Sequence, residues 1–339
     1  MTAASRAQLR LLGLWLAAAV AAAALGLSGR MADRPGLSFA LYGTAFAVLI
    51  VSVWLPVEWP RQRRAVAVAV LVTLGVLVRL AYLGYPVSDD VHRYALEGRL
   101  QAAGGNPYVQ APDEFLAAHG DDPILAGVNH KDVPGIYPPL AMLLCRAVVA
   151  VEYSLRAFKA LAFGCELITL AALAALLLVT ARPVKWLALY ALNLLVLLTG
   201  VGEAHLDVAV LALLAVALLC GAWADRHRRA AGHAAMFLLL GAAVMVKFLP
   251  VILIPCLVTR RNPKRAPLAL LPLALFLPFR ADGMFGGLST FAGEMAYNDV
   301  VPRLLRLFAD GTGYRVLMLL VFGVGLGLIW LLYQDGRYA

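Results

Sequence analysis

Long hydrophobic runs dominate this sequence and restrict what it can fold into. Residues 11–28, 37–57, 186–202 and 316–334 contain no charged side chain. Each run is about as long as the ~20 residues that an α-helix needs to cross the hydrocarbon core of a bilayer. Shorter or interrupted hydrophobic runs lie at 65–85, 137–151, 160–181, 206–223, 234–258 and 266–279. Because backbone inside lipid must satisfy its own hydrogen bonds, we predict an all-α polytopic membrane protein with about ten hydrophobic helices.

The charged residues, only 14% of the chain, are distributed as in a membrane protein. The net charge of +9 comes from basic residues that cluster in short segments between hydrophobic runs: Arg61, Arg63, Arg64, Arg226, Arg228, Arg229, Arg260, Arg261, Lys264 and Arg265. Loops of this kind stay on the cytoplasmic side. The positive charge therefore reflects topology, and we expect membrane lipids and no nucleic acid as partners.

The N-terminus has two interpretations. Arg6 and Arg10 precede an alanine-rich run that ends near Ser28, as in a cleaved signal peptide. The run is long for a signal peptide, however, and a second hydrophobic run follows at once. An uncleaved first span is favoured.

Placing the basic loops inside orients the rest of the chain. The segment 86–135 then becomes a large, acidic extracytoplasmic loop, and 280–314 a second outer loop. The count of crossings requires one helix between 137 and 223 not to cross, and the short, proline-led 137–151 is the best candidate. Residues 234–258 are expected to form a hairpin of two half-helices around Lys247. We predict a single membrane domain, made of two N-terminal spans (1–64), a core (65–260) and C-terminal spans (261–339).

Polar residues gather where the third hydrophobic run ends. Ser88, Asp89 or Asp90 can cap a helix that runs through Ala103. Spacing of three and four residues places Asp90 on one face with Arg93, Tyr94 and Glu97. A solvated helix start would look the same, but polar groups near or inside membrane spans are costly and usually functional.

Further polar groups of this kind are Arg79, Glu203, His205, Asp207 and Lys247. Arg79 could simply extend its head group to the interface, and His205 could be a capping or packing residue. Lys247 has apolar flanks and needs an anionic partner. Glu203, His205 and Asp207 spread over too wide an arc of a helix to hold one metal ion, so we predict neither a metal site nor a cofactor, although a divalent ion is possible.

Several motifs in order resemble the GT-C superfamily of polyprenyl-phosphate-sugar-dependent glycosyltransferases, and especially its bacterial mannosyltransferase-like branch. They are Asp89-Asp90-x-x-Arg93-Tyr94-x-x-Glu97-Gly98, Gly105-Asn106-Pro107-Tyr108, Ile136-Tyr137-Pro138-Pro139-Leu140, His205-x-Asp207 and Lys247-Phe248-Leu249-Pro250. The resemblance covers residues 65–260. The two spans before the acidic loop and the short C-terminal part depart from the family pattern.

This resemblance implies a GT-C-type bundle and a catalytic aspartate at the start of the first outer loop. Asp90, or else Asp89, would be that residue. A carboxylate can accept a proton from the attacking hydroxyl, and cations can stabilise the departing phosphate. The candidates for the phosphate are Arg79, Arg93, His205 and Lys247, and those for the substrate pocket are Tyr94, Glu97, Tyr137, Glu203 and Asp207.

We therefore predict an inverting hexosyltransferase of the cell envelope, with mannose as the expected sugar and a glycan or lipid as acceptor. The expected location is a bacterial inner membrane, with the active site facing the extracytoplasmic side. The alternatives are a secondary transporter, which would normally show paired broken helices in two related halves, and a catalytically silent lipid-binding subunit of an envelope assembly.

Overall fold

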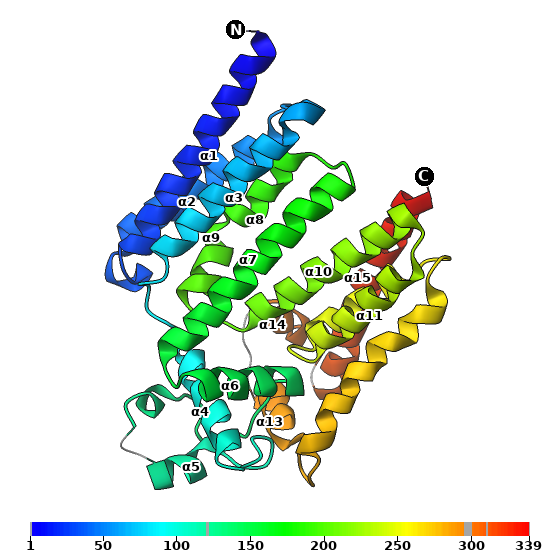
Figure 1. Cartoon of the computed structure of the whole chain (residues 1–339). Helices are drawn as coiled ribbons and strands as arrows, with labels where there is room; N and C mark the ends of the chain where they lie inside the picture. The colour runs from blue at the N-terminus through cyan, green and yellow to red at the C-terminus, as the bar shows by residue number, and fades with distance from the viewer. Residues whose placement is uncertain (1, 120–121, 295–299, 310, 339) are drawn as a thin grey trace.

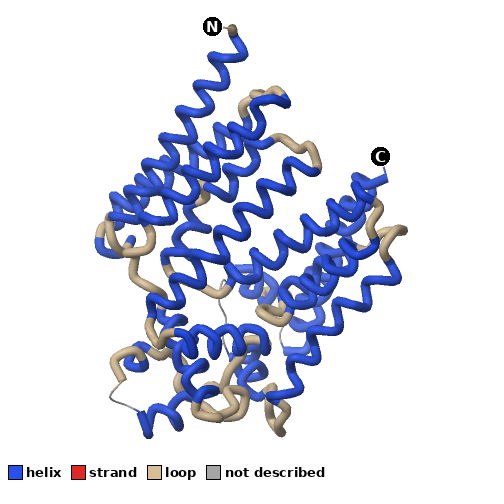
Figure 2. Tube along the Cα trace, viewed as in Figure 1, coloured by secondary structure: helices blue, strands red, loops and turns tan. Residues whose placement is uncertain are grey.

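The computed structural model describes all residues except 1, 120–121, 295–299, 310 and 339. The two predicted outer loops include some of these positions, so they are described only in part. Within the described residues the chain is helical, and Figure 2 draws no strand. The prediction of an all-α protein is confirmed.

Every hydrophobic run expected from the sequence forms helix. Within the described residues, six helices are long and apolar enough to cross a membrane, or up to seven if the bent pair Val184–Ala191 and Leu194–Gly202 is one span. The long spans are α1 (Ala3–Leu27), α2 (Pro35–Trp54), α3 (Arg64–Ala81), α7 (Leu155–Val179), α10 (Asp207–His227) and α15 (Gly311–Tyr338). The protein is a multi-pass integral membrane protein, and not every hydrophobic helix is long enough to cross.

The run 186–202 is not one straight helix. It consists of η4 (Val184–Leu187), α8 (Ala188–Ala191), α9 (Leu194–Leu197) and the π-helical turn η5 (Leu198–Gly202). The two halves meet at 44°. Asn193 lies at the bend, and its side chain accepts hydrogen bonds from the backbone N–H groups of Leu195 and Val196, so that a new helix begins there.

The remaining helices are shorter than these long spans. They are η1 (Met31–Asp33), η2 (Arg61–Arg63), α4 (Asp89–Ala102), α5 (Pro112–His119), η3 (Leu125–Gly127), α6 (Pro139–Val151), α11 (Ala230–Val244), η6 (Leu249–Ile252), α12 (Leu253–Leu257), η7 (Pro263–Phe279), α13 (Gly286–Glu294) and α14 (Val300–Arg306). The predicted break at Lys247 is present, since α11 ends at Val244 and helix resumes at Leu249.

Two groups of helices build the core. α1, α2 and α3 pack together and against α7 and the bent pair, around a cluster that includes Trp15, Leu71 and Leu197. α10 packs between α7 and α11, and α11 packs on η7. Figure 1 shows α4, α5, α6 and α13 at the opposite end of the bundle from the start of α1 and the end of α15.

Helix α6 lies across the ends of the long spans in Figure 1, as expected for the helix that does not cross. With 13 residues it is too short to span the hydrocarbon core. It packs against α4 at Gly98, where a Cβ atom would lie 2.5 Å from the carbonyl oxygen of Cys145. Only glycine permits this approach, which brings the beginning of α6 close to the acidic first turn of α4.

Candidate active site

A cavity of about 620 Å³ lies between the first turns of α4, the beginning of α6, the segment after α11, and α13. One part of its lining is polar and includes Asp89, Asp90 and Asn129, with Lys247 from another segment. Phe248 and Leu288 belong to an apolar part of the same lining. The cavity can therefore hold a ligand that has both a charged and a hydrocarbon portion.

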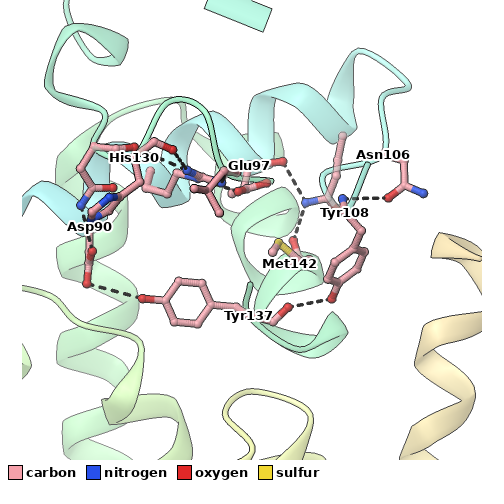
Figure 3. Close-up of polar contacts among 11 residues, drawn as sticks. Asp90, Glu97, Asn106, Tyr108, His130, Tyr137 and Met142 are labelled. Atoms are coloured by element: carbon pink, nitrogen blue, oxygen red, sulfur yellow. Dashed lines mark hydrogen bonds and ion pairs between the residues drawn. The ribbon is translucent and has the colours of Figure 1, made fainter. Parts of the chain in front are cut away.

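Asp90 is held by residues from three separate segments. Its Oδ2 lies 3.2 Å from Nδ1 of His205 and 3.5 Å from the hydroxyl group of Tyr137, which donates to it. Its Oδ1 accepts a hydrogen bond of 3.3 Å from Asn129, whose amide also donates to Asp89 over 3.0 Å. Figure 3 shows Asp90 and Tyr137 facing each other. The carboxylate thus has a fixed position although its own helix supplies none of these partners.

His205 bridges two carboxylates, because its Nε2 lies 3.4 Å from Oε2 of Glu203 while its Nδ1 faces Asp90. The backbone before it is unusual. The π-helical turn closes with a hydrogen bond from Glu203 N to Leu198 O, and Ala204 follows with φ of 60°. A residue with a side chain rarely adopts this left-handed conformation, and such strain collects at functional sites. Here the turn lets Glu203 and His205 approach Asp90 from the side.

Lys159 of α7 fixes this turn from below. Its buried ammonium group donates to the carbonyl oxygens of Gly202 (2.7 Å), Tyr82 (3.1 Å) and Val201 (3.3 Å). These carbonyls belong to the ends of two helical segments, where backbone acceptors lack partners within the helix. Lys159 therefore joins the end of α3 to the turn that carries Glu203 and His205, without entering the cavity.

The contacts of His205 set the ionisation of the site. Burial alone would raise the pKa of Asp90. The hydrogen bond and the charge of His205 outweigh burial, and Asn129 and Lys247 add smaller effects of the same sign, so the pKa of Asp90 is lowered. Burial likewise opposes the charged form of His205, yet its bonds to Asp90 and Glu203 raise its pKa to about 9. At neutral pH the pair is a carboxylate and an imidazolium.

Lys247 lies in the break between α11 and η6 and borders the cavity. Its Nζ is 2.6 Å from Oδ1 of Asp207, and both side chains are about half exposed. The same segment holds α6, since the carbonyl oxygen of Met245 accepts hydrogen bonds from the backbone N–H groups of Leu140 and Ala141. The break thus presents a cation to the cavity and anchors the helix that follows Tyr137.

Arg93 and Glu97 form a buried ion pair along α4, with 2.7 Å between Nε and Oε1. The guanidinium group also donates to the carbonyl oxygens of His130 (2.9 Å) and Val133 (2.6 Å). Burial raises the pKa of Glu97 in spite of Arg93. Oε2 of Glu97 is buried without a hydrogen-bond partner among the described residues. Arg93 thus clamps the loop that covers the cavity, and Glu97 has an acceptor left for a ligand.

The motifs recognised in the sequence meet around Tyr137. The ring of Tyr94 packs edge-on against that of Tyr137, with 5.6 Å between centroids. The hydroxyl group of Tyr108 donates to the carbonyl oxygen of Tyr137 over 2.8 Å, as Figure 3 shows, and Gly135 N donates to Pro107 O over 2.7 Å. These motifs therefore support one another and position the tyrosine that contacts Asp90.

Of the proposed phosphate ligands, Arg93 and Lys247 line the cavity and His205 contacts Asp90 on its wall, whereas Arg79 lies away from both. Its side chain is fully buried, and its guanidinium group contacts Oε2 of Glu166 at 2.6 and 2.8 Å and the carbonyl oxygens of Gly75 and Ala191. These partners saturate it. Arg79 holds α3 against α7 and the bent pair, so we do not carry it into the proposed site.

Two polar residues near the site were not expected from the sequence. Asn129 comes from an irregular loop and contacts Asp89 and Asp90, and Lys159 lies inside a long hydrophobic span. Neither has a periodic or motif-like signal. Within the described residues, no group of three or more His, Cys, Asp or Glu side chains is arranged to hold a metal ion.

Comparison with known families identifies the family of this chain. The family model described as "Alpha-(1->6)-mannopyranosyltransferase, N-terminal domain" matches residues 10–261, which include every candidate site residue. The chain belongs to this family. The protein is therefore a mannosyltransferase, as the resemblance to polyprenyl-phosphate-dependent enzymes implied, and the family transfers mannose from a polyprenyl-phosphate donor to a glycan. No curated protein and no solved structure matches the chain.

Proposed function

We propose that the cavity beside α4 is where the mannosyl group is transferred, with Asp90 as the general base and Lys247 as the cation for the donor phosphate. The single observation that carries this proposal is the fixed, ionised carboxylate of Asp90 on the wall of a cavity that Lys247 also lines. With one carboxylate acting as base, the transfer is a single displacement at the anomeric carbon, and a single displacement inverts the configuration there.

The chemistry follows from these positions. The acceptor hydroxyl oxygen attacks the anomeric carbon as the bond from that carbon to the phosphate oxygen breaks. The leaving electron pair stays on the polyprenyl phosphate, and Asp90 takes the hydroxyl proton. A cation near the departing phosphate stabilises the charge that develops there, and Lys247 is assigned this role. His205 holds Asp90 ionised and adds positive charge behind it.

The rest of the lining fits a lipid-linked sugar. Phe248, Leu249 and Leu288 offer apolar surface to the first isoprene units. The free Oε2 of Glu97 can accept a hydrogen bond from a sugar hydroxyl group, which would remove the cost of leaving it buried and unpaired. The acceptor is a glycan or a lipid.

We also propose that this cavity faces the extracytoplasmic side of a bacterial inner membrane. The basic loops around Arg61 and Arg226 lie at the other end of the bundle, which the positive-inside rule places in the cytoplasm. A single cysteine at Asp113 should react with an impermeant thiol reagent in intact cells. Labelling only after lysis would reverse the orientation.

The direct test is release of polyprenyl phosphate. The purified protein is incubated with a panel of polyprenyl-phosphate sugars, with and without a mannose-containing acceptor. Polyprenyl-phosphate mannose should be turned over, and the other sugars should not. Turnover of another donor, or no turnover when both donor and acceptor are present, would refute the proposed site chemistry.

A further inference from the structure

A second cavity, of about 680 Å³, is lined by residues at the end of the bundle that Figure 1 shows opposite to α4. It opens between the α2–α3 connection, the α7–α8 connection and the last turn of α10. Its charged lining residues are Arg61, Arg64, Arg182, Lys185, Arg226 and Glu58. Five cations thus converge with a single carboxylate on one hollow, although they come from three separate parts of the sequence.

The positive-inside rule explains why basic residues occur at this end, but not why they surround a cavity. Part of their arrangement is structural. Arg64 donates to the carbonyl oxygen of Ala181 over 2.9 Å, and Arg226 to that of Val179 over 2.8 Å. Both carbonyls belong to the C-terminal end of α7, where positive charge is favourable. Each guanidinium group has five N–H donors, so these bonds leave others available.

Two of the cations have no such structural partner. Among the described residues, the side chains of Arg61 and Arg182 form neither a hydrogen bond nor an ion pair, and no carboxylate lies within ion-pair distance of any of the five cations. Like charges held together without an anion repel one another. An anion with several oxygen atoms would relieve this repulsion, and arginine matches phosphate in a two-point arrangement.

The uncharged lining indicates where such an anion would come from. Val57, Val184 and Trp59 form part of the wall, and Trp59 stacks on Trp15 with 6.2 Å between ring centroids. The indole Nε1 of Trp59 is buried without a partner among the described residues. The cavity lies at the ends of membrane spans, and the positive-inside rule places this end beside the head groups of the cytoplasmic leaflet.

The geometry points to a phosphate-binding site in this cavity, separate from the transfer site, that takes the phosphate of an anionic phospholipid head group or a soluble phosphate. Arg61 and Arg182 contribute the free donors, Arg64 and Arg226 the donors left after they cap α7. The site anchors the α2–α3 and α7–α8 connections to one another through the shared anion.

The test compares Arg61→Gln/Arg182→Gln with the control Arg229→Gln/Lys264→Gln, which removes the same charge from exposed positions in other basic loops. Each delipidated protein is titrated with phosphatidylglycerol, phosphatidylcholine or inorganic phosphate, and bound ligand is counted by native mass spectrometry. Among the described residues, none of the four replaced side chains forms a hydrogen bond or an ion pair, and melting curves check that both variants are folded.

Wild type and the control should retain phosphatidylglycerol over phosphatidylcholine, and the cavity variant should bind it about tenfold more weakly, since each basic residue near an anionic head group contributes measurably. Binding of inorganic phosphate that the cavity variant loses would identify the soluble source and still support the site. Equal binding by the cavity variant and the control would overturn it. Mannosyl transfer by either variant reports on the other cavity, so the two proposals fail separately.

Discussion

Replacing Asp90 by Asn tests the proposed base while leaving its surroundings intact. Asparagine has the same shape, and its oxygen can still accept from Tyr137 or Asn129. It cannot take a proton. Removing a positioned general base costs about 10²- to 10⁴-fold in rate. Because His205 lowers the pKa of Asp90 and so makes it a weaker base, we expect a loss nearer the lower limit, about 3 to 4 kcal/mol of transition-state free energy.

The same substitution has a second, independent readout. Asp90 is one of two carboxylates that raise the pKa of His205 to about 9. In Asp90→Asn that pKa should fall towards its ordinary value, which NMR of labelled histidine can follow. Asp89→Asn is the matched control, since Asp89 contacts Asn129 but not His205.

The assay is release of polyprenyl phosphate under saturating donor, with donor binding measured separately. Asp90→Asn should bind donor and transfer almost no mannose, and Asp89→Asn should be milder. If Asp90→Asn kept more than a tenth of wild-type turnover while Asp89→Asn was inactive, the base would be Asp89. Activity in both variants would refute the mechanism.

Further predictions concern the cations. Lys247→Met should raise the donor KM strongly and change the melting temperature little. The control Lys131→Met, an exposed change in the outer loop, should leave the donor KM unchanged. Equal kinetics in the two variants would show that Lys247 does not bind the donor phosphate. Arg79→Met should leave Glu166 buried without its partner and destabilise the protein by about 3–5 kcal/mol, which is measured as a lower melting temperature in detergent. The double variant Arg79→Met/Glu166→Met should recover part of this loss. A stable but inactive single variant would contradict the structural role of Arg79. His205 is protonated below about pH 9 in the folded protein and only below about 6.5 when unfolded, so its ion pairs stabilise the site fully below pH 6.5, and this contribution should be lost as pH rises through 9. Turnover should fall in the same range, and a profile flat from pH 7 to 10 would show that the imidazolium is not required.

The sequence predicted the parts of this fold that have a local signal. Uncharged runs marked the spans, the Ser-Asp-Asp start marked α4, and the two half-helices expected within 234–258 marked the break at Lys247. The bend at Asn193 was missed, because one polar residue in a hydrophobic run does not show whether it caps a new helix.

The candidate site was only partly predictable, because its contacts join distant segments. The sequence placed Asp90 beside Arg93 on one helical face, but its partners in the structure are His205, Asn129 and Tyr137. Arg79 looked like a free cation near a helix end, since nothing in the sequence links it to Glu166, 87 residues away. Pairings of this kind have no periodicity, so they become visible only once the helices are placed side by side.

Lys159 changes how a mutational scan of this protein should be interpreted. A screen that records only lost turnover would rank Lys159→Met with the residues that line the cavity. Among the described residues, however, its ammonium group donates hydrogen bonds only to the backbone of Tyr82, Val201 and Gly202. Loss of this ammonium group would free the turn before His205, and the position of Asp90, the proton acceptor on α4, would then be less well fixed. Loss of activity therefore cannot by itself mark the boundary of the catalytic centre, and donor binding must be scored alongside it.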